Sequence, residues 1–121
     1  MTISVVIPFY NESESIQRTL SCIDNQEFLP SEVIFVDSGS TDNTAEIINS
    51  HIDLYNKSNY RVIYCGEMSP SSSLNRGIEE SGSELIAYMD CGLNIPPNWL
   101  LESLKIMEDH NCDIVSLQIK T

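Results

Sequence analysis

Short apolar runs alternate along the chain with longer segments that carry apolar residues at helical spacing. The apolar runs cover residues 3–7, 33–36, 60–65, 85–89 and 112–119. Runs of this length, bounded by turn-forming residues, are typical of buried β-strands. The pattern therefore predicts five strands separated by helices.

The segments between these runs predict helices that begin at residues 11–14, at 40 or 41, at about 74 and after 97. In the first of them, Ile16, Leu20 and Ile23 have the i, i+4, i+7 spacing of a core-facing helix, and Asn11 precedes Glu14 by three residues, as in a helix cap. Strands that alternate with helices imply a largely parallel sheet with right-handed crossovers. We predict an α/β, Rossmann-like fold with helices on both faces of the sheet.

The composition is that of one soluble domain. The chain has 121 residues, 41% of them hydrophobic, and no apolar run approaches the ~20 residues that span a bilayer. The residues after Met1 do not form an export leader, and the four cysteines are scattered. We expect a single domain over 1–121, reduced thiols, no membrane segment in this chain and a cytoplasmic location, peripheral to a membrane at most.

The formal net charge is −12, from six basic and eighteen acidic residues. Such a surface repels a phosphate backbone, so nucleic acid is excluded as a partner. A bound diphosphate would need helix N-termini, a metal ion or residues outside this chain.

Carboxylates follow two of the predicted strands, Asp37 after 33–36 and Asp90 after 85–89. Ligands of open α/β sheets bind outside the carboxyl ends of the strands, so both are candidate contacts. Each segment also has a purely structural interpretation, as a turn at Gly39 or Gly92. The structural interpretation explains Asp37 less well than the residues that follow it, because a carboxylate that ends a strand helps neither strand nor helix unless something binds it, and the two interpretations of Asp37 weigh about evenly.

Two further segments leave the same choice open. The aromatic and polar loop 8–12 suits contact with a base or a sugar, but taken alone it is better explained as a strand end with a helix cap. Arg76 lies near the predicted helix start at 74, where a cation opposes the helix dipole, and an exposed arginine is usually just solvated.

Taken together, five segments resemble one family. They are VVIPFYNE at 5–12, VDSGSTD at 36–42, LNRGI at 74–78, IAYMD at 86–90 and PPNWL at 96–100. In content, order and spacing they resemble the nucleotide-sugar-dependent glycosyltransferases of family 2, which have the GT-A fold and are mostly inverting. The resemblance spans nearly the whole chain.

The resemblance implies a donor-nucleotide pocket. Pro8, Tyr10 and Glu12 match the family's first-strand motif, which lies against the base and the ribose. Asp37 matches the carboxylate that reads the base by hydrogen bonding, and Asn75 belongs to the same predicted pocket. The implied ligand is a nucleotide-diphosphate sugar such as a UDP-sugar.

The resemblance also implies a divalent cation. Asp90 matches the first acid of the family's Asp-x-Asp element, which contacts the ribose or the metal, and Arg76 is the only cation near the predicted phosphate position. In the family, Mg²⁺ or Mn²⁺ neutralises the diphosphate leaving group. Gly92 stands where the second acid would fall, so we expect metal affinity to be weaker or differently built.

A GT-A catalytic domain runs to about twice this length, and its second half carries the acceptor site and the catalytic base. We therefore interpret 1–121 as the nucleotide-binding half of a glycosyltransferase in glycan or polysaccharide biosynthesis, inactive alone, with the base beyond Thr121. The acceptor is a glycan, a lipid or a protein. Apolar surface left open at the end of the fragment would favour self-association. The alternative is a non-catalytic nucleotide-binding or scaffold module.

Overall fold

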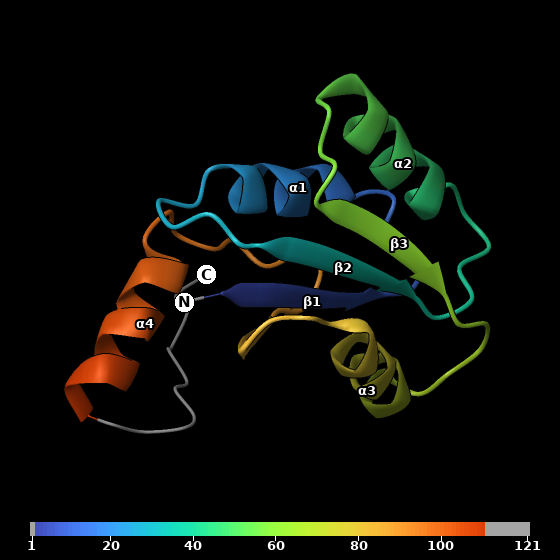
Figure 1. Cartoon of the computed structure of the whole chain (residues 1–121). Helices are drawn as coiled ribbons and strands as arrows, with labels where there is room; N and C mark the ends of the chain where they lie inside the picture. The colour runs from blue at the N-terminus through green and yellow to red at the C-terminus, as the bar shows by residue number, and fades with distance from the viewer. Residues whose placement is uncertain (1, 111–121) are drawn as a thin grey trace.

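The computed structural model of the chain describes residues 2–110, which form a parallel sheet with helices on both faces (Figure 1). In chain order, the elements are β1 (Ile3–Phe9), α1 (Ile16–Asp24), β2 (Glu32–Asp37), α2 (Thr44–Leu54), β3 (Tyr60–Tyr64), α3 (Pro70–Glu80), β4 (Leu85–Tyr88) and α4 (Trp99–His110). The predicted α/β fold class is confirmed. The strand predicted at 112–119 lies outside the described residues.

The strand order is β3-β2-β1-β4, and every neighbouring pair is parallel. The chain adds β2 and β3 on one side of β1 and then crosses back to place β4 on the other side. In open α/β sheets, ligands bind at the carboxyl ends of the strands where the order reverses in this way. The topology therefore places a site between the ends of β1 and β4.

The two faces of the sheet pack against different helices. Val5, Ile7 and Phe35 belong to the larger core, which also holds buried residues of α1, α2 and α4. Val6 and Ile34 face the other way, into a smaller core with partly buried residues that include Leu74 of α3. Figure 1 shows α1 and α2 on one side of the sheet and α3 on the other.

The α3 helix lies unusually close to the sheet at Gly77. A Cβ at this position would be 2.3 Å from Val6 Cγ1 and 3.1 Å from Val36 Cγ2. Both valines are fully buried, so neither can move aside. Glycine is therefore required here for the helix to pack on β1 and β2.

The start of α1 differs from the prediction. The helix begins at Ile16 with Ser15 as its N-cap, and Asn11 lies outside it with a φ of 51°. The Asn11 side-chain oxygen accepts hydrogen bonds from the backbone N–H of Thr41 at 2.8 Å and of Asp42 at 3.3 Å. Asn11 therefore joins the loop after β1 to the turn after β2 instead of capping a helix.

The start of α2 differs for the same reason. The helix begins at Thr44, three residues later than the latest predicted start. Ser40 Oγ accepts a hydrogen bond from Asn11 N at 2.9 Å, and Thr44 Oγ1 accepts one from Glu12 N at 2.9 Å. The side chain of Asp42 accepts from the Thr44 hydroxyl at 2.5 Å. These polar groups fix the two loops against each other.

The start of α3 also lies earlier than predicted, at Pro70. Ser69 caps the helix by accepting from the backbone N–H of Ser72 at 3.2 Å, and proline suits the first helical position because its missing N–H has no partner there. The serines at 71–73 are helical, so the predicted start at about residue 74 is wrong.

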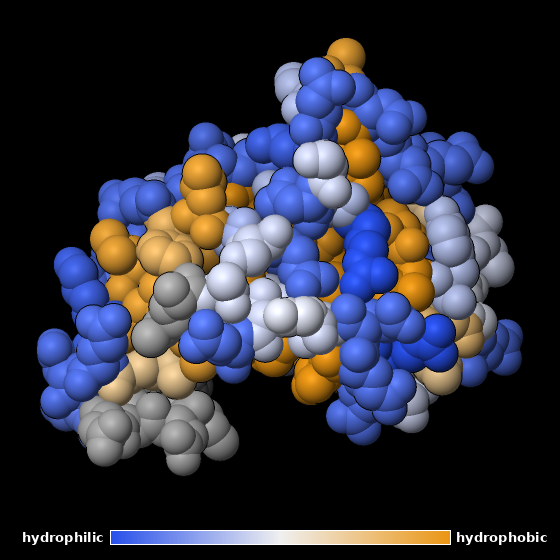
Figure 2. Space-filling view, viewed as in Figure 1, coloured by the Kyte–Doolittle hydropathy of each residue, from blue (hydrophilic) through white to orange (hydrophobic). Residues whose placement is uncertain are grey.

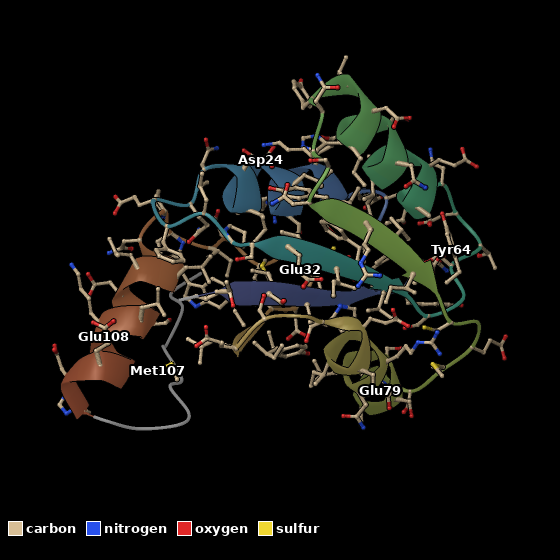
Figure 3. The ribbon with its side chains drawn as sticks, viewed as in Figure 1. Asp24, Glu32, Tyr64, Glu79, Met107 and Glu108 are labelled. Atoms are coloured by element: carbon tan, nitrogen blue, oxygen red, sulfur yellow. The ribbon has the colours of Figure 1, made fainter. Side chains whose placement is uncertain are left out.

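A carboxylate at the end of α1 connects α1, α2 and β3. Asp24, labelled in Figure 3, accepts a hydrogen bond from the Tyr60 hydroxyl at 2.6 Å and lies 2.7 Å from His51 Nε2. Burial, together with the hydrogen bond and charge of Asp24, raises the pKa of Tyr60. This cluster lies at the end of the molecule opposite the carboxyl ends of the strands, and there its contacts join α1, α2 and β3.

No helix within residues 2–110 has the length and apolar character needed to cross a bilayer. In the view of Figure 2, hydrophilic residues cover much of the surface, and hydrophobic residues lie between them in separate patches.

Gly77→Ala should destabilise the protein. Overpacking a close contact costs about 1–3 kcal/mol, and the higher helix propensity of alanine returns about 1 kcal/mol. We expect a net loss of up to about 2 kcal/mol in the free energy of unfolding, measured by urea denaturation. Gly82→Ala is the matched control, since a Cβ there would meet only Glu32 Oε2 at 3.6 Å. Equal stabilities of the two variants would contradict the close-packing argument.

Asp42→Asn should reduce the acid sensitivity of the fold. The hydrogen bond from the Thr44 hydroxyl, with further bonds from backbone N–H groups, holds the pKa of Asp42 below its ordinary value. A depressed folded-state pKa contributes stability that is present above the ordinary pKa and lost as pH falls through the folded-state value. We therefore expect thermal unfolding to show that wild type loses more stability than Asp42→Asn between about pH 6 and about pH 3.

The control is Asp53→Asn, which removes an exposed carboxylate near the far end of α2. It should lose stability with pH as steeply as wild type does. An Asp42→Asn variant with the wild-type acid response would show that the Asp42 hydrogen bonds do not stabilise the folded state.

Candidate functional site

A cleft of about 580 Å³ opens at the carboxyl ends of β1 and β4. Its walls come from the end of β1 and the following loop, the residue after β2, the β3–α3 connection with the start of α3, and the end of β4. The lining residues are Pro8, Phe9, Tyr10, Glu12, Ser38, Glu67, Met68, Pro70, Tyr88, Asp90 and Cys91. The cleft therefore lies where the strand order reverses.

Four of the predicted site residues line this cleft: Pro8, Tyr10, Glu12 and Asp90. Pro8 is in β1, Tyr10 and Glu12 are in the loop after β1, and Asp90 follows β4. Tyr10 is 54% exposed, so its ring is open to a ligand. The structure brings these side chains together from segments that are nearly 80 residues apart in the sequence. Their roles toward a nucleotide stay predictions.

Asp37 does not line the cleft and is only 6% exposed. Its Oδ1 accepts hydrogen bonds from the backbone N–H of Gly39 at 3.1 Å and of Ser40 at 2.8 Å. The argument that this carboxylate has no structural use is therefore wrong, because it closes the turn after β2. Ser38, the next residue, is in the cleft wall, and its hydroxyl lies 2.6 Å from that of Ser73 in α3. The base-reading role of Asp37 stays a prediction.

Asn75 and Arg76 also lie outside the cleft lining. Because α3 begins at Pro70, Arg76 is in the middle of the helix and not at its start, so the prediction of its position is wrong. Its guanidinium lies 3.3 Å from the Glu80 carboxylate, one helical turn away. Both residues are exposed, and their predicted part in nucleotide binding stays a prediction.

Asp90 is exposed in the cleft and is held by Tyr88, whose hydroxyl donates a hydrogen bond to Asp90 Oδ1. This hydrogen bond, with partial burial and the Asp90 charge, raises the pKa of Tyr88 to about 12. Tyr88 is therefore protonated at neutral pH and donates to Asp90. One oxygen of Asp90 is occupied in this way.

The segment after Asp90 packs against α1. Cys91 Sγ lies 3.5 Å from Thr19 Oγ1, and burial, the main cause, raises the pKa of the Cys91 thiol. At neutral pH this side chain is a thiol, which is neither a strong nucleophile nor a good metal ligand.

The cleft carries negative charge. Among residues 2–110, the lining includes the carboxylates of Glu12, Glu67 and Asp90 and no lysine or arginine. One oxygen of Glu12 accepts a hydrogen bond from Ser15 Oγ at 2.6 Å. Within residues 2–110, no three His, Cys, Asp or Glu side chains lie close enough together to hold a metal ion. The described residues do not by themselves fit the expected divalent cation.

Sequence reasoning missed several lining residues, among them Tyr88, Glu67 and Met68. The sequence pattern assigns Tyr88 only to a strand, although its position two residues before Asp90 puts both side chains on the same side of an extended chain. The position of Glu67 and Met68 depends on how the β3–α3 connection crosses the sheet, for which the local sequence carries no signal.

Comparison with known proteins identifies relatives over the same segment. The sequence model described as "Glycosyl transferase family 2" matches residues 4–121. The glycosyltransferase AglE of Haloferax volcanii is 33% identical over 116 residues, which cover 93% of this chain and 38% of AglE. This chain therefore spans little more than a third of that relative.

Solved structures agree in fold. The S. aureus TarS fragment 1–349 in complex with UDP matches 92% of this chain with a TM-score of 0.78 and 27% identity, over 33% of its own length. Glucosyl-3-phosphoglycerate synthase from Mycobacterium tuberculosis, solved with Mn²⁺, UDP and glucosyl-3-phosphoglycerate, matches 88% of this chain with a TM-score of 0.68 and 27% identity, over 39% of its own length.

The family model covers all but the first three residues of the chain. The parallel sheet and its helices, matched by these solved structures, agree with that assignment. The chain therefore belongs to glycosyl transferase family 2.

Proposed function

We propose that the whole protein is a nucleotide-sugar-dependent glycosyltransferase and that this chain binds the nucleoside part of the donor. The observation that carries the proposal is the cleft at the strand-order reversal, lined by Pro8, Tyr10, Glu12 and Asp90. Support comes from the family assignment and from the UDP complexes of the TarS fragment and glucosyl-3-phosphoglycerate synthase.

The lining suits a nucleoside better than a phosphate. The exposed ring of Tyr10 offers a surface on which a base can stack, and Pro8 and Met68 add apolar contact. The carboxylates of Glu12 and Asp90 can accept hydrogen bonds from base N–H groups or ribose hydroxyls. A base and a ribose are uncharged, so the acidic cleft does not repel them.

The diphosphate needs positive charge that the cleft lining lacks. Mn²⁺ is present in the structure of glucosyl-3-phosphoglycerate synthase. For the whole protein we propose Mg²⁺ or Mn²⁺, with Asp90 as one protein ligand and the others supplied by the diphosphate or by residues outside 2–110. Bound there, the cation would neutralise the leaving group.

The proposed reaction forms one bond at the anomeric carbon of the donor sugar and breaks another. An acceptor hydroxyl oxygen attacks that carbon, the bond to the diphosphate breaks, and the hydroxyl proton passes to a base outside the described residues. In-line attack inverts the configuration at the carbon. An acceptor in glycan or polysaccharide synthesis and a cytoplasmic active site, peripheral to a membrane at most, complete the proposal.

Tyr10→Ala should weaken nucleotide binding. Loss of base stacking on an aromatic ring costs about 1–3 kcal/mol, which is about a 5- to 150-fold rise in Kd. The measurement is calorimetric titration of the chain with UDP, GDP, dTDP and ADP, each with EDTA and with Mn²⁺. Comparison of the four diphosphates identifies the preferred base.

The matched control is Tyr55→Ala, which removes a tyrosine of similar exposure, 58%, from the far end of α2. It should leave the Kd unchanged. If none of the four nucleotides binds at millimolar concentration, or if both tyrosine variants bind like wild type, the cleft is not the donor site.

A further inference from the structure

The backbone at Gly92 disfavours a carboxylate at the position where the family's Asp-x-Asp element has its second acid. Gly92 has a φ of 93°, in the left-handed region that strains any L side chain. A Cβ built there would lie 3.2 Å from Ser15 Oγ and 3.4 Å from Ser15 Cβ. The same Cβ would be 3.8 Å from Glu12 Oε2, so an aspartate at 92 would also face a like charge.

The space beside Gly92 is already used. Ser15 donates a hydrogen bond to Glu12 Oε2 at 2.6 Å, which holds the Glu12 carboxylate next to Gly92. Position 92 therefore lacks a ligand for a structural reason, and the loss is not one that a single substitution would reverse.

The segment Asp90–Gly92 is held by α1 through direct hydrogen bonds. Gly92 N donates to Thr19 Oγ1 at 2.8 Å, and Arg18 Nη1 donates to Gly92 O at 3.2 Å. Thr19 is fully buried, so its hydroxyl is a fixed acceptor. Both polar groups of the Gly92 backbone have protein partners, and α1 alone provides them.

We propose that α1 takes over the ordering of the Asp90–Gly92 segment that a cation would otherwise provide, so that residues 2–110 have no Mn²⁺ site of their own. The inference rests on the geometry of this segment alone. It makes Arg18, Thr19 and Gly92 positioning residues for the cleft.

The first test titrates Mn²⁺ alone into the chain and follows it by electron paramagnetic resonance. We expect no stoichiometric site with a Kd below about 1 mM. Stoichiometric Mn²⁺ binding by wild type that is lost in Asp90→Asn would overturn the inference. This readout needs no nucleotide, so it decides the inference even if the proposed function fails.

The second test uses substitutions at two glycines with positive φ. Gly92→Ala adds both strain and crowding, whereas Gly66→Ala adds strain alone, since a Cβ at Gly66 would have no neighbour within 4 Å among residues 2–110. We expect Gly92→Ala to have the lower Tm and Gly92→Asp to fall at least as far, with no recovery in Mn²⁺. A rise in the Tm of Gly92→Asp on addition of Mn²⁺ would show that position 92 can hold a ligand and would overturn the inference.

Discussion

The structure depends on the position of β1 between β2 and β4. Both edges of β1 are hydrogen-bonded to parallel neighbours, and its residues are buried against helices on both faces. After β3 the chain has to cross back over the sheet, and it does so through α3, which packs on β1 and β2 at Gly77. That crossing brings the end of β4 beside the end of β1 and creates the cleft between them.

This dependence explains what the sequence could predict. Strands and their terminal carboxylates follow from local apolar runs, so the fold class and Asp90 were within reach. Strand order has no local signal, because it results from how the helices cross the sheet. The end of β2 therefore seemed as good a site as the end of β4, although the Asp37 carboxylate closes its own turn and the next residue, Ser38, is the one in the cleft wall.

The predicted positions of the helix starts are wrong for a different physical reason. Asn11, Ser40 and Asp42 are all good helix-capping residues, and local patterns assign them to caps. In the folded chain they bind one another across the two loops, over separations of 29 to 31 residues. A side chain that can cap a helix can equally satisfy the backbone of a distant loop. Propensity identifies such residues as hydrogen-bonding groups, and only the tertiary structure decides which backbone groups they satisfy.

The negative charge of the cleft reflects the composition of the whole chain as well as the residues that line the cleft. Of the six basic residues in the chain, Arg61 and Arg76 are paired to glutamates, and Arg18 donates to Gly92 O after the end of β4 without lining the cleft. A cleft lined by three carboxylates raises the electrostatic cost of any diphosphate that enters without a compensating cation. Contacts to the base and the ribose do not carry this electrostatic cost, because both groups are uncharged. The hydrogen bonds from α1 order the Asp90–Gly92 segment before any ligand binds. A pre-ordered site loses less conformational entropy on binding, so more of the free energy of the contacts to the base and the ribose remains as affinity.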